Sequence, residues 1–189
     1  KMGFAIADAC ARAGALTTLI SGPVNQQTPE RVSRLDVISA QDMYDAAHTA
    51  AAECDIFISC AAVADYRPAT SESQKIKKSG DSMQIELVRN PDIVASIANR
   101  EDRPFTVGFA AETQDVESYA LGKLRDKKLD MIVANDVSGS EAGFNSDNNA
   151  ATILWQEQRK EVELTSKHRL AEVLVECMAE VLAIATAAK

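Results

Sequence analysis

The chain of 189 residues has few of the residues and segments that mark several protein classes. It contains two histidines and four cysteines, and no two cysteines form a C-x-x-C pair. A zinc site is therefore not expected. No apolar run reaches the roughly 18 to 20 residues that cross a bilayer, and no signal-peptide pattern opens the sequence. The cysteines, which lie mainly in Ala-rich or apolar stretches, are interpreted as reduced core thiols of a cytoplasmic protein.

Positive charge is also scarce. Twenty Lys and Arg stand against 28 Asp and Glu, which gives a net charge of −8. This balance argues against broad binding of nucleic acid or of an anionic membrane, so any anionic ligand must meet a local basic cluster. The remaining composition, 46% hydrophobic and 25% charged, excludes disordered and low-complexity classes. The length is sufficient for a buried core.

Helical and strand periodicities alternate along the sequence. We expect strands at 15–20, 32–38, 55–60, 83–89, 104–110 and 129–135, and helices at 2–13, 40–53, 91–100 (with Pro91 at its first position) and 115–128. Two further strands, 151–156 and 160–164, form a hairpin before a helix over 166–187. This pattern predicts an α/β fold with a mostly parallel sheet, helices on both faces and an antiparallel hairpin near the C-terminus. Without a linker or repeat, residues 1–189 are expected to form a single domain.

The first expected element is a helix. A doubly wound sheet normally begins with a strand and a phosphate-binding turn that lead into the first helix. We therefore expect a first strand and its loop to be missing from this sequence, so that the domain is incomplete at its N-terminus.

Several segments carry candidate binding chemistry. Asp65 follows the strand at 55–60 and could accept hydrogen bonds from a ligand or help to hold a metal, although a turn role is the simpler interpretation. The segment K-I-K-K places Lys75, Lys77 and Lys78 in a polar stretch that suits a mobile lid over a polyphosphate. A solvated charge run would look the same.

Three other places are also candidates. Lys123 and Lys127 share one face of the helix at 115–128, where an anion would relieve their repulsion. The helix start Pro91–Asp92–Ile93–Val94 could bind an anion, and Phe109 in G-F-A-A-E-T could stack on a base or pack in the core.

The order of these motifs is more specific than any one of them. A-A-V-A-D-Y, K-I-K-K, N-P-D-I-V, G-F-A-A-E-T, K-x-x-x-K and A-N-D-V with G-F-x-S-D-x-N follow one another over essentially the whole chain. This series closely resembles the bacterial phosphopantothenoylcysteine synthetase family, commonly the C-terminal half of a bifunctional protein. The resemblance implies a Rossmann-like, three-layer fold, a homodimer, and ligation of 4′-phosphopantothenate to L-cysteine with CTP and Mg²⁺. FMN is implied only for a fused decarboxylase half.

The resemblance also implies residue roles. Asp65, Phe109, Lys123, Lys127 and Pro91 to Val94 (including Asp92 and Ile93) contact the nucleotide, and Lys75 meets the triphosphate from a flap. Ala61 and Ala62 border the pantothenoyl pocket, and no metal ligand is assigned. The family's N-x-S-S-G loop would come immediately before Lys1, in agreement with the expected missing strand, and without it this chain alone is expected to be inactive.

Two other functions remain open. A nicotinamide-dependent oxidoreductase of the same fold would use a Tyr/Lys relay, for which Tyr119 and Lys123 have the spacing. That function would leave Lys127 and the K-I-K-K segment unused. A non-catalytic nucleotide-binding module is the other alternative.

Overall fold

The computed structural model describes residues 1–77, 80–112, 115–136, 146–156 and 158–187. Its elements follow the order α1 (Met2–Arg12), β1 (Thr17–Ser21), β2 (Val32–Asp36), α2 (Ala40–Ala51), β3 (Ile56–Ser59), β4 (Tyr66–Pro68), β5 (Leu87–Arg89), α3 (Ile93–Ala98), β6 (Phe105–Glu112), α4 (Val116–Asp126), β7 (Met131–Asp136), β8 (Asn148–Trp155), β9 (Gln158–Ser166) and α5 (Lys167–Ala187). No helix in these ranges is both long and apolar enough to cross a bilayer.

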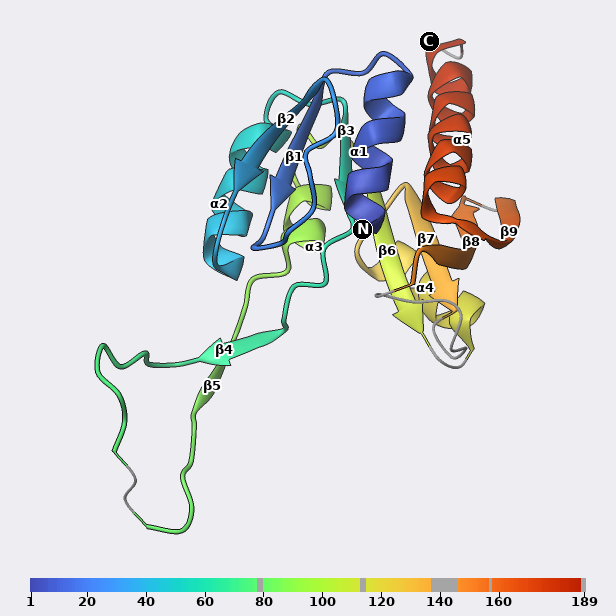
Figure 1. Ribbon diagram of the computed structural model, residues 1–189. Helices are drawn as coiled ribbons and strands as arrows, with labels where there is room; N and C mark the ends of the chain where they lie inside the picture. Colours follow the sequence, from blue (N-terminus) through green and yellow to red (C-terminus); the bar gives the residue numbers. More distant parts are fainter. Residues whose placement is uncertain (78–79, 113–114, 137–145, 157, 188–189) are drawn as a thin grey trace.

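The main sheet has five strands in the order β3-β6-β7-β8-β9 (Figure 1). The β3-β6 and β6-β7 pairs are parallel, whereas β8 and β9 add antiparallel strands at one edge. Strands β1 and β2 form a separate parallel pair, and in the described part of the chain no strand joins β1 to β3. The predicted α/β class, its parallel strands and its C-terminal hairpin are confirmed. The strand expected before the first helix stays a prediction.

Helices cover both faces of the five-stranded sheet. In β7, Met131 and Val133 pack against α1 and α5, whereas Ile132 and Ala134 pack toward α4. All four side chains are at most 1% exposed. This alternation follows from the two-residue period of a strand, so a continuous apolar run is the expected sequence of a strand buried on both faces.

Several expected element boundaries differ from the structure by two residues or more, and two of these differences have a clear physical cause. The strand expected over 83–89 is reduced to β5, Leu87–Arg89, because its antiparallel partner β4 supplies only three paired residues. The helix expected to begin at Pro91 begins at Ile93, with Asp92 as its N-cap. The Asp92 carboxylate accepts a hydrogen bond from the Ala95 backbone N–H at 3.1 Å, and this places Pro91 before the cap.

Strands β4 and β5 form the base of an arm. Between them, residues 69–77 and 80–86 run far from the body of the molecule as extended chain (Figure 1). Lys75 and Lys77 lie on this arm and are exposed, while Lys78 falls outside the described residues.

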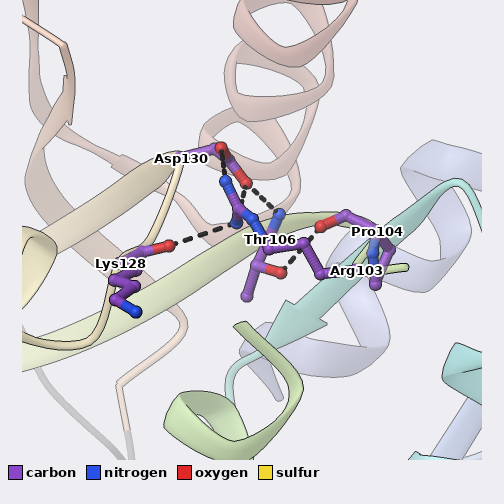
Figure 2. A network of polar contacts seen from close by, with 5 residues as sticks. All are labelled: Arg103, Pro104, Thr106, Lys128 and Asp130. Atoms are coloured by element: carbon purple, nitrogen blue, oxygen red, sulfur yellow. Dashed lines mark hydrogen bonds and ion pairs between the residues drawn. The ribbon is translucent and has the colours of Figure 1, made fainter. Parts of the chain in front are cut away.

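A polar network fixes the amino ends of β6 and β7 (Figure 2). Arg103 donates from its two terminal nitrogens to the two carboxylate oxygens of Asp130 at 2.8 and 2.6 Å. One of those oxygens also accepts from the backbone N–H of Thr106 at 2.7 Å. Thr106 is fully buried, and its hydroxyl donates to the Pro104 carbonyl at 2.9 Å. Asp130 therefore satisfies a guanidinium and a main-chain donor at once.

Replacing this carboxylate should destabilise the fold. Asp130→Ala leaves the Thr106 N–H without its acceptor and removes the bidentate pair with Arg103, which keeps its bond to the Lys128 carbonyl at 3.1 Å, and we expect the free energy of unfolding in urea to fall by about 2 kcal/mol. Asp102→Ala is the matched control. It removes an ion pair with Arg100 of similar length, 3.1 Å, but the Asp102 side chain is 71% exposed, so little change is expected. Equal losses in the two variants would contradict a special role for Asp130.

Candidate functional site at the carboxyl edge of the sheet

The parallel strands β3, β6 and β7 end at the same edge of the sheet, so the residues that follow them gather there. Ala61 and Ala62 come directly after β3 and are exposed, whereas the preceding Cys60 packs against the main core. Burial raises the pKa of the Cys60 thiol to about 11. Cys60 is therefore held as a neutral thiol, and the open surface at this strand end belongs to the two alanines.

Asp65 is held in place by its main chain. Its carbonyl accepts the Asn90 backbone N–H at 2.8 Å, and the Asn90 side chain donates to the neighbouring Ala64 carbonyl, also at 2.8 Å. Arg67 in turn donates to the Asn90 side-chain oxygen at 2.9 Å. These bonds join the start of the arm to the segment that leads into α3. They fix the backbone of Asp65 while its exposed side chain faces solvent.

An ion pair joins two predicted binding segments. The Lys127 ammonium lies 2.9 Å from the carboxylate of Asp92, so the cap of α3 is connected to the end of α4. Burial acts to raise the pKa of Asp92, but the hydrogen bonds from Lys127 and Ala95 and the Lys127 charge outweigh it and hold this pKa below its usual value. The carboxylate therefore stays ionised.

The structure places the other predicted nucleotide residues in different surroundings. Lys123 lies one helical turn before Lys127 on α4 and is half-buried. Ile93 is a core residue between α2 and α3, and Val94 packs toward α4. Of the segment 91–94, only Asp92 therefore offers a polar side chain.

Phe109 lies on the other face of the sheet. Its half-buried ring packs against the core formed with α1 and α5, opposite to the face covered by α4. Lys75 lies apart from this group, on the extended arm (Figure 1).

The structure places further polar residues at this edge, two of them from the motifs A-N-D-V and G-F-x-S-D-x-N and one, Lys167, from none of the motifs. The Asn149 side chain donates to the Asn135 side-chain oxygen at 3.0 Å, between β8 and β7. Lys167, at the start of α5, is buried and donates to the Ser146 carbonyl. No motif distinguishes Lys167, because a lysine before an amphipathic helix normally indicates an exposed residue. The predicted segments G-F-x-S-D-x-N and G-F-A-A-E-T extend into residues 143–145 and 113, outside the described residues.

This fold, with charged and polar side chains gathered where parallel strands end, defines an α/β domain of the Rossmann-like class. The family model of the DNA/pantothenate metabolism flavoprotein C-terminal domain matches residues 1–182, and the chain belongs to this family.

Named relatives agree with this assignment. The chain is 58% identical over 174 residues to the coenzyme A biosynthesis bifunctional protein CoaBC of Vibrio vulnificus strain YJ016, an alignment that covers 90% of this chain and 43% of that protein. It is 52% identical over 180 residues to the protein of that name from Escherichia coli K12, covering 93% and 44%. The chain thus spans less than half the length of these relatives.

A solved structure shows the same fold. The crystal structure of the C-terminal domain of a CoaBC protein superposes with a TM-score of 0.80 at 35% identity, over 96% of this chain and 82% of that chain. The resemblance inferred from the motif order is therefore confirmed at the level of family and fold.

Proposed function

We propose that this chain is the ligase domain that joins 4′-phosphopantothenate to L-cysteine with CTP, in coenzyme A biosynthesis. The observation that carries the proposal is the set of contacts that joins the segments marked by the family motifs: the Asp65 carbonyl accepts the Asn90 backbone N–H, and Asp92, two residues further on, pairs with Lys127. The relatives' names support the pathway, since they are coenzyme A biosynthesis bifunctional proteins.

In the proposed reaction, the carboxylate of phosphopantothenate attacks the α-phosphorus of CTP. The bond to the bridging oxygen breaks, and pyrophosphate leaves. The amine of cysteine then attacks the acyl carbon of the cytidylate, loses a proton and releases CMP. No protein cysteine is needed as a nucleophile, which is consistent with the neutral state of Cys60.

Anionic reactants set the electrostatic requirement. A carboxylate and a triphosphate must approach each other, so positioning and counter-charge dominate the barrier. In a chain of net charge −8, Lys123 and Lys127 bring positive charge to the nucleotide side, and Lys75 would add more when the arm approaches. We infer that the arm acts as a lid over the triphosphate.

Magnesium fits this site as a partner of the triphosphate. Among the residues whose placement is described, no three acidic, histidine or cysteine side chains come together as a metal site. Mg²⁺ usually takes one or two protein carboxylates together with substrate phosphates, and the exposed Asp65 could supply one. Bound Mg²⁺ would neutralise triphosphate charge. Any FMN is assigned to the decarboxylase half of a bifunctional protein.

The arm also supports a homodimer. It carries large apolar side chains that are between 51 and 64% exposed, namely Tyr66, Ile76, Met83, Ile85 and Leu87. An extended segment with this much apolar surface is typical of a protein interface. We infer that a second copy of the chain covers it.

The function is tested by following pyrophosphate release from the full-length protein, supplied with phosphopantothenate, cysteine and each of CTP, ATP, GTP and UTP in turn. Release that depends on phosphopantothenate and is fastest with CTP is expected. No release with any nucleotide, together with hydride transfer to or from a nicotinamide, would instead support the oxidoreductase alternative.

Asp65 is expected to act on the nucleotide. Because its main-chain bridge to Asn90 does not involve the side chain, Asp65→Ala should weaken CTP binding while the thermal unfolding curve stays in place. Titration of the full-length protein with CTP measures the affinity. An unchanged affinity would show that Asp65 is a turn residue only.

Lys75 is expected to act on the reaction and not on the fold. Lys75→Gln should change the free energy of unfolding by less than about 0.5 kcal/mol, since the residue is exposed. Loss of a charge contact made mainly in the transition state should lower kcat for pyrophosphate release by roughly a hundredfold, or about 3 kcal/mol. Conversion of supplied acyl-cytidylate should suffer less.

Lys77→Gln provides the matched control, since it removes an equal charge two residues along the same arm. We expect a smaller loss there. Equal effects would mean that only the overall charge of the arm matters, and a normal rate in Lys75→Gln would show that the segment is a solvated charge run.

A further inference from the structure

Lys167 has an unusual environment for a lysine. It is the first residue of α5, and its side chain is 5% exposed, which makes it the one buried Lys or Arg in the ranges that the structure describes. A lysine at a helix start normally extends its ammonium into water. Burial lowers the pKa of Lys167, the nearby Lys1 lowers it further, and Asp147 opposes the change. Burying a cation costs free energy unless hydrogen bonds or opposite charges stabilise it.

These contacts hold one short segment. The Lys167 ammonium donates to the Ser146 carbonyl, and its backbone N–H donates to the Asp147 carbonyl at 2.9 Å. Ser146 and Asp147 come directly before β8, so Lys167, at the start of α5, is hydrogen-bonded to both of them. The Ser146 hydroxyl accepts the Asn148 backbone N–H at 3.0 Å, which closes a turn at the same point.

Asp147 also connects the segment of Ser146 and Asp147 to the start of α1. The carboxylate of Asp147 accepts from the Lys1 ammonium at 2.7 Å, directly before α1 begins. Hydrogen bonding and the charge of Lys1 lower the pKa of Asp147, so this pair is ionic. A continuous series of polar contacts therefore runs from Lys167 through Ser146 and Asp147 to the N-terminal end of α1.

The series lies beside the end of β3. The charge of Lys167 acts on the thiol of Cys60, which directly precedes Ala61 and Ala62. Cys60 packs with the core on the α1 and α5 face, whereas Lys127 belongs to α4 on the opposite face. The contacts of Lys167 are thus on the side of Ala61 and Ala62 and away from the Asp92–Lys127 pair.

We propose that Lys167 is a positioning residue for the phosphopantothenate side of the site. By holding Ser146 and Asp147, it sets the place of Lys1 and of the start of α1 next to the end of β3, where an acidic substrate would be bound. This inference rests on the proposed function and adds a residue that acts on the acid substrate and not on the nucleotide.

Steady-state kinetics of the full-length protein test this role. Lys167→Met keeps the apolar stem and removes the charge and donors, and we expect it to raise the KM for phosphopantothenate about tenfold while the KM for CTP stays within about twofold. Lys167→Arg should restore most of the loss. Lys160→Met is the matched control, because Lys160 is a half-buried lysine on β9, paired with Ile153 and away from the carboxyl edge; both KM values should stay at wild-type levels.

A second variant works even where Lys167→Met does not fold. The Asp147 side chain is 87% exposed, so Asp147→Asn should fold normally, and it should raise the KM for phosphopantothenate severalfold because it weakens the link to Lys1. If the two residues act in series, the double variant should be no worse than Lys167→Met alone. Equal rises in both KM values, additive effects, or an unchanged KM in Asp147→Asn would overturn the inference. A wild-type protein that releases no pyrophosphate would overturn the proposed function itself, and the substrate assigned to Lys167 with it.

Discussion

Strand β7 lies between the parallel strand β6 and the antiparallel strand β8, and both of its faces are covered by helices. This two-sided burial constrains the rest of the molecule. Along β7, every second side chain must pack against α1 and α5, and the side chains between them must pack against α4. A shift of β7 by one residue would exchange the two sets, so its register with β6 is strongly specified. Once that register is set, β3, β6 and β7 end at a common edge.

The amino and carboxyl ends of the sheet differ in their polar contacts. At the amino end, Asp130 satisfies Arg103 and the Thr106 backbone N–H, and these contacts fix how β6 and β7 begin (Figure 2). At the carboxyl end, the contacts of Lys167 hold the segment that precedes β8, and the ion pair of Asp92 with Lys127 connects the start of α3 to the end of α4. Rigid positioning at one end lets the other carry exposed polar side chains such as Asp65.

The sequence predicts best those elements whose pattern comes from burial. The apolar run that becomes β7 and the long amphipathic segment that becomes α5 were predicted close to their observed bounds. Prediction from sequence fails where the bounds of an element depend on contacts with other residues. Residues 83–86 have the alternation of a strand, but β4 is too short to pair with them. Pro91 suits a helix start, but the side chain of Asp92 provides the cap and moves the start to Ile93.

In the candidate site, too, some residues were predicted from the sequence and others depend on long-range contacts. The motif order marked Asp65, Asp92 and Lys127, and the fold connects their segments through the Asp65–Asn90 main-chain bond and the Asp92–Lys127 ion pair. It did not mark Lys167, because the environment of this residue arises only when α5 and β8 pack beside β7 and α1. Burial of a lysine depends on contacts between segments about 20 residues apart or more, and local sequence carries no sign of it.

The arrangement of charge around the sheet suits a reaction with two anionic substrates. Under the proposed function, CTP and phosphopantothenate must both be held, and their charges repel wherever they are not neutralised. Lys123 and Lys127 lie on the α4 side, and Lys1 and Lys167 lie on the α1 and α5 side. On the α1 and α5 side, the Lys1 and Lys167 ammonium groups are engaged by Asp147 and the Ser146 carbonyl, so these two residues position the segment before β8. Lys75 lies on the arm and belongs to neither group, so it can add its charge after both substrates are in place.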